Sequence, residues 1–147
     1  MQLPQKPLGG KMTSPTYPIQ KLETSEAPLA IGPYSQGTAT MNGQPLIFVS
    51  GQLPIDPKTG KLVQGSIQVM TKQVIDNLEA ILHSAGSSLD FVMRADVFLT
   101  DLSQFSAMNE EYARRFKGPV LPARQTVQVA ALPLGSAIEI SCIAVKG

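Results

Sequence analysis

The sequence predicts an α+β fold, with two helices on one face of a mixed sheet of about six strands. Two stretches repeat apolar residues at spacings of three and four, which is the period of an amphipathic helix. Other stretches alternate apolar and polar residues, which is the period of a strand with one buried face. The predicted order along the chain is strand, hairpin, helix, strand, helix, strand and strand.

The first predicted elements are a short strand at residues 19–22 and a β-hairpin. Asn42 and Gly43 separate two extended runs, residues 35–41 and 45–50. An Asn-Gly pair between such runs is typical of a hairpin, because both central residues of a type I′ turn need a positive φ. We therefore expect these two runs to pair with each other.

The first helix is predicted after a turn at residues 56–60. Apolar residues repeat with helical spacing from about Ser66 to Ala85, and Gly86 follows as a C-terminal stop. Residues 93–100 then alternate as a strand.

The second helix is predicted from a stripe of large apolar residues, which we interpret as core positions. The stripe consists of Phe105, Met108, Tyr112 and Phe116. Ser103 is the expected N-cap of this helix. Two further strands, residues 124–131 and 137–145, close the chain.

Length and composition exclude several classes of protein. The 147 residues suit one domain, and the net charge of +1 gives no electrostatic footprint for nucleic acid or a membrane surface. One cysteine and one histidine cannot form an internal disulfide or a four-ligand Cys/His zinc site. We expect Cys142 to be buried and inert, and His83 to be a helix-end residue.

The first sixteen residues differ from the rest of the chain. They contain several prolines and no acidic residue, and they lack the apolar core of a secretory signal. We expect residues 1–16 to be a disordered extension and residues 17–147 to form a single domain. A remnant of a transit peptide, or a leader before a start at Met12, remains an alternative for the extension.

The last two predicted strands place polar side chains on a face that should hold apolar ones. If the helices cover one face of the sheet, the other face carries Arg124, Thr126, Gln128, Glu139 and Ile143. Its apolar members need a cover, and a second copy of the chain is the simplest one.

An Arg and a Glu on one face suggest a site for a small carboxylate. Arg124 could bind that carboxylate through paired charge-assisted hydrogen bonds, and Glu139 could move a proton or orient a water. The commoner arrangement of two such residues is a cross-strand salt bridge, which contributes only about 0.2–1 kcal/mol. From the spacing alone both interpretations stay open. Tyr34, in a loop rich in Pro and Gly, could line the same cleft or pack on the core.

Seven short segments resemble the Rid family, the reactive intermediate deaminases also called the YjgF family. In order they are AIGPYSQ (30–36), VSGQLP (49–54), DPKTG (56–60), DVFLTD (96–101), MNEEY (108–112), PAR (122–124) and IEI (138–140). The resemblance runs unbroken over residues 19–145. One segment alone would be weak, whereas seven in sequence are specific.

The resemblance implies a chorismate-mutase-like α+β fold that assembles as a homotrimer, with a site in each cleft between subunits. It implies hydrolysis of reactive 2-imino acids, or of their 2-aminoacrylate enamine tautomers, to 2-oxo acids and ammonia. Pyridoxal-phosphate dehydratases release these intermediates. The family's reaction needs no metal and no cofactor.

The resemblance also assigns roles to individual residues. Arg124 matches the Arg that binds the substrate carboxylate in the deaminating branch, and Glu139 matches the Glu that positions or activates the attacking water. The remaining matches are substrate-binding positions at Tyr34, Ser50, Asn109 and Thr126. Thr126 stands where several members have a Cys whose backbone carbonyl is used.

Two departures from the family pattern concern the shape of the cleft. Gln125 stands where the family usually has a small residue such as Ser, and Ser141 replaces a common acidic residue. These changes bear on substrate range more than on activity.

Two other functions remain as alternatives to the deaminase. One is a non-catalytic trimeric module that binds small acids or a protein, and the other is an endoribonuclease or translation inhibitor. The presence of Arg124 argues against the first, and the near-neutral charge argues against the second. We expect a cytoplasmic location, or an organellar one if the extension is a transit remnant.

Overall fold

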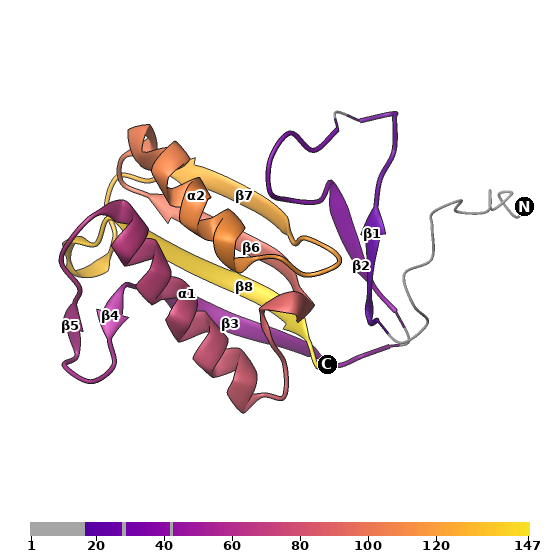
Figure 1. Cartoon of the computed structure of the whole chain (residues 1–147), viewed down its shortest axis with the longest axis horizontal. Helices are drawn as coiled ribbons and strands as arrows, with labels where there is room; N and C mark the ends of the chain where they lie inside the picture. Colours follow the sequence, from indigo (N-terminus) through magenta and orange to yellow (C-terminus); the bar gives the residue numbers. More distant parts are fainter. Residues whose placement is uncertain (1–16, 28, 42) are drawn as a thin grey trace, which may run out of the picture.

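The computed structural model describes residues 17–27, 29–41 and 43–147. The predicted extension, residues 1–16, lies outside the described residues. The fold is α+β: two helices cover one face of a central mixed sheet, and two small sheets flank it (Figure 1). No helix among the described residues is long and apolar enough to cross a membrane.

The elements follow the predicted order of strands and helices, with two further short strands on either side of the turn predicted at residues 56–60. The strands are β1 (Ile19–Leu22), β2 (Gly37–Thr40), β3 (Leu46–Gln52), β4 (Ile55–Asp56), β5 (Lys61–Leu62), β6 (Val92–Leu99), β7 (Ala123–Gln128) and β8 (Ile138–Val145). The helices are α1 (Ile67–Ser84) and α2 (Phe105–Arg115), and short 3₁₀ turns lie at Leu89–Phe91, Leu102–Gln104 and Pro133–Gly135.

The central sheet has the order β3-β8-β6-β7. Strand β8 pairs antiparallel with β3 and β6, whereas β6 and β7 are parallel. A parallel pair needs a long crossover connection, and α2 supplies it. The strand β7 therefore lies at an edge of the sheet, beside the helix that precedes it in the chain.

The core lies between this sheet and the helices. Its members alternate along β8, where Ile138, Ile140, Cys142 and Ala144 are buried. On α1 they repeat with the helical period, and they include Val74, Ile75, Leu78 and Leu82. Each such aliphatic side chain contributes about 1.5–3 kcal/mol when buried.

The first helix agrees with its prediction at both ends. The Ser66 hydroxyl accepts a hydrogen bond from the Val69 backbone N–H at 3.3 Å, which satisfies one donor of the first turn. Gly86, just past the helix, has a φ of +74°. A residue with a side chain adopts that conformation at a cost, so glycine is the natural stop.

The second helix begins differently from its prediction. Ser103 is not the N-cap; the Asp101 carboxylate instead accepts the Ser103 backbone N–H at 3.0 Å and caps the 3₁₀ turn that leads into α2. A carboxylate is a strong acceptor at a helix start, so Asp101 takes this position two residues earlier.

The predicted hairpin between residues 35–41 and 45–50 is wrong. Strand β2 pairs with β1, and β3 pairs with β8 instead. Gly43 does have a positive φ of +64°, and Asn42 lies outside the described residues. Turn residues fix local φ values but do not choose the partner strand, and β8 offers β3 a longer apolar ladder than β2 could.

The prediction of a single sheet of about six strands is also wrong, because the sequence of one strand does not determine its partner strand. Four strands form the central sheet, and β1-β2 and β4-β5 form separate two-stranded sheets. Strands β4 and β5 have two residues each, which is too short to extend the ladder. The Thr38 hydroxyl donates to the Met93 carbonyl at 2.8 Å and joins β2 to β6.

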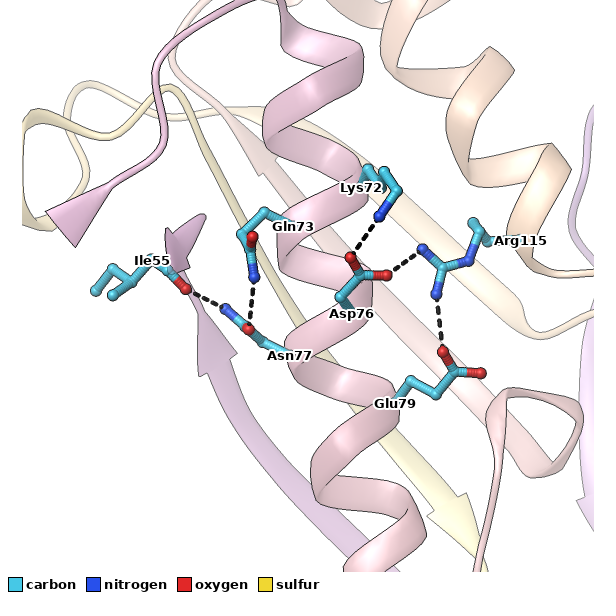
Figure 2. Close-up of polar contacts among 7 residues, drawn as sticks. All are labelled: Ile55, Lys72, Gln73, Asp76, Asn77, Glu79 and Arg115. Carbon is cyan, nitrogen blue, oxygen red and sulfur yellow. Dashed lines mark hydrogen bonds and ion pairs between the residues drawn. The ribbon is translucent and has the colours of Figure 1, made fainter. Parts of the chain in front are cut away.

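A network of charged side chains fixes the two helices to each other (Figure 2). Arg115 on α2 donates to Asp76 at 2.6 Å and to Glu79 at 2.9 Å on α1, and Lys72 donates to Asp76 at 2.7 Å. Partial burial alone would raise the pKa of Asp76, but hydrogen bonds from Lys72 and Arg115 lower it. This network holds α2 in place over β6 and β7.

Candidate functional site

Arg124 lies on β7 with its guanidinium among aromatic rings. Its Cζ atom lies 4.7 Å from the centre of the Tyr112 ring, and 5.7 Å from the centres of the Tyr34 and Phe105 rings. Contacts between a cation and the face of a ring contribute about 0.5–2 kcal/mol each. The rings therefore hold the guanidinium in place and keep part of it away from water.

The Arg124 guanidinium uses only one of its N–H donors in a hydrogen bond to a described residue. Its Nη1 atom donates to Asn109 Oδ1 at 2.6 Å, and no described carboxylate pairs with it. Burial lowers the pKa of Arg124, whereas Tyr112 and Tyr34 raise it. Because an arginine stays protonated in proteins and carries five N–H donors, a half-buried one with a single partner suits a bound carboxylate.

The loop that carries Tyr34 is attached directly to the start of β7. The Ser35 backbone N–H donates to the Pro122 carbonyl at 2.9 Å, and the Ser35 hydroxyl donates to the Leu121 carbonyl. The Tyr34 hydroxyl accepts the Ile31 backbone N–H at 3.3 Å. These bonds place the half-buried Tyr34 ring against Arg124.

Glu139 lies on the other face of the sheet from Arg124. On the shared neighbour β6, Arg124 is opposite Ala95 and Glu139 is opposite Phe98. Positions three residues apart on a strand point to opposite faces. Of the residues predicted to share the open face, Glu139 and Ile143 do lie there, whereas Arg124, Thr126 and Gln128 share the opposite face, toward the helices, so the prediction of one common face is wrong.

The reason for this error is the position of β7 at the sheet edge. Its alternation is as predicted, but its polar side chains face α2 rather than the open face. There Asn109 Oδ1 accepts a hydrogen bond from Arg124, and the Gln128 side-chain oxygen accepts one from the Leu102 backbone N–H at 2.8 Å. Polar side chains on an edge strand can thus face the helices when they form hydrogen bonds with polar groups on that side.

Arg124 and Glu139 do not meet within one chain. Their backbones are separated by two strand spacings, about 10 Å, and by three residues along the strands, about 10 Å more. They also point in opposite directions. The cross-strand salt bridge is excluded together with a shared site inside a single chain.

The Glu139 carboxylate lies against the backbone of Gly51 on β3. Between Val49 and Gln52 the pairing of β3 with β8 shifts its register, and Gly51 falls in this bulge. Glu139 is half-buried and forms no hydrogen bond or ion pair within residues 17–147 as described. Ser50, the residue before Gly51, is exposed.

The predicted site residues thus form two groups, one on each face of the sheet. Tyr34, Asn109 and Arg124 lie together on the helix side, whereas Glu139 lies on the open side against Gly51, the residue after Ser50. Thr126 lies on the helix side, where its hydroxyl is buried without a partner among the described residues.

Two residues beside Arg124 were missed as site residues in the sequence. The apolar stripe predicts Phe105 and Tyr112 only as core positions, and Tyr112 is indeed fully buried. Together with Asn109 they follow the spacing i, i+4, i+7 on one helix face. That face precedes the strand that carries Arg124, and this was the available signal.

Two other chemically capable side chains, Cys142 and His83, belong to neither group. Cys142 is buried, and burial raises the pKa of its thiol to about 12, so it is unreactive at neutral pH. His83 is exposed in the last turn of α1. Among the described residues, no three His, Cys, Asp or Glu side chains are placed to hold a metal ion.

A hollow of about 440 Å³ lies between α1 and the β3-β4 segment. Its walls are mostly apolar and include Leu53, Ile55, Ala80 and Ile81. It touches Gly51 but neither Arg124 nor any charged side chain. It therefore offers no cationic side chain that would pair with a carboxylate.

Comparison with known proteins places these residues in a family context. A family model described as "Endoribonuclease L-PSP" matches residues 24–146. A RutC family protein of Pyrococcus horikoshii is 48% identical over 84% of this chain and 94% of that protein. The 2-iminobutanoate/2-iminopropanoate deaminase of Mus musculus is 44% identical over 86% of this chain and 90% of that protein. A crystal structure of a Rid family protein from Yersinia pestis is 44% identical, with a TM-score of 0.67, over 86% of this chain and 98% of that one.

Proposed function

We propose that this chain, which belongs to the endoribonuclease L-PSP family that includes the RutC and Rid proteins, hydrolyses 2-imino acids and their enamine tautomers to 2-oxo acids and ammonia. The observation that carries the proposal is the guanidinium of Arg124, which is half-buried among three rings and free of any described carboxylate partner. Relatives named as deaminases of 2-iminobutanoate and 2-iminopropanoate support the choice of substrate.

In the proposed reaction Arg124 binds the substrate carboxylate through two N–H groups. This fixes the neighbouring C=N carbon relative to the protein, and positioning of this kind supplies much of the acceleration of an already electrophilic group. Tyr34 and Asn109 keep the guanidinium oriented. The enamine reaches the same state after it takes a proton on carbon and becomes the imine.

Glu139 activates the attacking water in the proposed reaction. The water oxygen bonds to the imine carbon while one water proton passes to the Glu139 carboxylate, and Glu139 then gives this proton to the nitrogen, which forms the carbinolamine. The carbinol hydroxyl next passes its proton through Glu139 to the nitrogen, the C–N bond breaks, ammonia leaves, the oxygen becomes the new carbonyl, and Glu139 is a carboxylate again. Water and imine are consumed and the 2-oxo acid and ammonia are formed, with no oxidation or reduction.

The two residues must come from different copies of the chain in this proposal, because they lie on opposite faces of one sheet. The open face that carries Glu139 also carries apolar side chains without a covering layer. Phe48 is 72% exposed on it, and Leu46 and Val127 are exposed as well. A second copy that covers this face would bring its own Arg124 toward Glu139.

The assembly we propose is a homotrimer. A contact between the β7 edge of one copy and the open face of the next joins two different surfaces, and such contacts form a ring when the rotation between copies closes. The expected solution mass is about 47 kDa, three times the 15.7 kDa of one chain. A ring of three holds three equivalent sites.

Replacing Phe48 by aspartate is expected to break the assembly and to abolish activity. The side chain is largely exposed in one chain, so its loss leaves the fold of that chain intact, while a charge on the covered face opposes association. Light scattering should show a mass near that of a single chain. Val69→Asp, a change on the outer side of α1, is the matched control, and a Phe48→Asp protein with wild-type mass would contradict the assembly.

The proposed activity is tested with an imine generated in the reaction vessel. A pyridoxal-phosphate dehydratase acting on serine supplies 2-aminoacrylate, and the rate of 2-oxo acid formation is followed with and without this protein. The expected result is a faster rate that is proportional to the amount of protein added. An unchanged rate at every amount would overturn the proposal.

A further inference from the structure

We infer that Gly51 is a positioning residue for Glu139: the absence of a side chain at residue 51 gives the Glu139 carboxylate its place across the β3 backbone. This inference rests on the proposed function, because it assumes that Glu139 takes part in the reaction. It assigns a role to a residue that itself contributes no functional side chain.

The first observation is the irregular pairing around Gly51. Val49 is opposite Cys142 and Gln52 is opposite Ile140, so β3 advances three residues while β8 advances two. The extra residue forms a bulge, and a bulge redirects the side chains near it. Glu139 comes next to Ile140 on β8, at the point where the bulge alters the surface.

The second observation is the contact between Gly51 and the carboxylate. A Cβ atom at residue 51 would overlap the Oε1 atom of Glu139, and it would lie 2.8 Å from Cδ and 3.1 Å from Cγ. The separations from Oε1 and Cδ are too short for non-bonded atoms, and the separation from Cγ is tight. Any side chain at residue 51 therefore pushes the carboxylate away from its present place.

The third observation separates Gly51 from the glycines that the backbone requires. Gly43, Gly60 and Gly135 have positive φ values and no neighbouring atom within 4 Å of an added Cβ. Gly51 differs in both respects, because its φ is not in the left-handed region and an added Cβ would overlap the Glu139 side chain. Alanine at residue 51 thus fits the backbone, and its main conflict is with the Glu139 side chain.

The Glu139 side chain can move to relieve such a steric clash. Its carboxylate is at the end of a flexible side chain and has no hydrogen-bond partner among the described residues that would hold it. Gly51→Ala should consequently fold and assemble, with a displaced carboxylate. A displacement of about 1 Å in a catalytic group can lower a rate by up to about a hundredfold.

The test is a double-mutant cycle between residues 51 and 139. Gly51→Ala is expected to lower kcat for imine hydrolysis about tenfold or more, with KM changed by less than about threefold. In a Glu139→Gln background the same change should have no further effect on kcat. Glu139→Asp, which is shorter by one methylene, should recover part of the activity when it is combined with Gly51→Ala.

Gly37→Ala is the matched control, because a Cβ there makes only ordinary contacts, 3.4 Å from Leu22 side-chain atoms. It should leave kcat unchanged. If Gly51→Ala has wild-type kcat, or if it lowers kcat equally when Glu139 is already Gln, the inference is overturned.

A readout without substrate distinguishes failure of this inference from failure of the proposed function. The carboxyl carbon of Glu139 is observed by NMR in protein carrying ¹³C-labelled glutamate, and its signal is identified by its loss in Glu139→Gln. Gly51→Ala should shift this signal and Gly37→Ala should not. An unmoved signal overturns the role of Gly51 whatever the activity, whereas an inactive wild type overturns the proposed function alone.

Discussion

Replacing Arg124 by alanine is expected to lower kcat/KM for imine hydrolysis by about a hundredfold or more. The change removes two charge-assisted hydrogen bonds to the substrate carboxylate, and each contributes about 1.5–3 kcal/mol. Because about 1.4 kcal/mol corresponds to tenfold, the loss spans at least two orders of magnitude. The measurement is the rate of 2-oxo acid formation from an imine generated in situ, over a range of substrate concentrations.

Two further variants make this expectation specific to the guanidinium. Arg124→Lys keeps the charge but loses the paired donors and the flat face that lies on Tyr112, so its activity should fall between the wild type and Arg124→Ala. Arg114→Ala removes an exposed arginine of α2 outside the site and should leave kcat/KM unchanged. Wild-type activity in Arg124→Ala would contradict the proposed binding of the carboxylate.

Replacing Glu139 by glutamine is expected to lower kcat by about a hundredfold to ten-thousandfold, with little change in KM. Glutamine has the same shape and keeps the packing against Gly51, but it cannot take a proton from water. General-base catalysis contributes factors of that size. Single-turnover and steady-state rates of imine hydrolysis together separate this loss from a change in binding.

The control for Glu139→Gln is Glu110→Gln, a change at an exposed carboxylate of α2. It alters the net charge by the same amount and should have no effect on kcat. If Glu139→Gln raised KM and left kcat unchanged, Glu139 would act in substrate binding, and the proposed role in water activation would be wrong.

Much of the fold could be predicted because its signals are local. The apolar period from Ser66 to Ala85 predicts α1 together with its cap and its stop, and the alternation at residues 137–145 predicts β8. Each signal depends on the side chains of one segment only. The described structure confirms both elements to within one residue at each end.

The errors concern facts that no single segment contains. The pair Asn42-Gly43 is typical of a hairpin turn, yet the partner of β3 is β8, which lies almost a hundred residues further along the chain. Alternation likewise shows that Arg124 and Thr126 share a face, but it does not show which face. That depends on α2, whose Asn109 and Tyr112 meet Arg124 on the helix side.

The sequence predicts several residues of the candidate site, but it does not predict how they are arranged in space. Tyr34, Asn109 and Arg124 were named from short segments and do lie together. Phe105 and Tyr112 are predicted from the sequence only as core positions, and Gly51 appears there only within the segment VSGQLP. Their roles depend on contacts between distant segments, and these are visible only in the folded chain.

The central claim is that each site combines Arg124 of one copy with Glu139 of another. Its most direct test mixes two inactive variants, Arg124→Ala and Glu139→Ala, which are co-expressed with different affinity tags and purified through both tags. Every mixed ring of three then holds one complete site, so the account predicts about one third of the wild-type kcat. Activity no higher than that of the separate variants would contradict it.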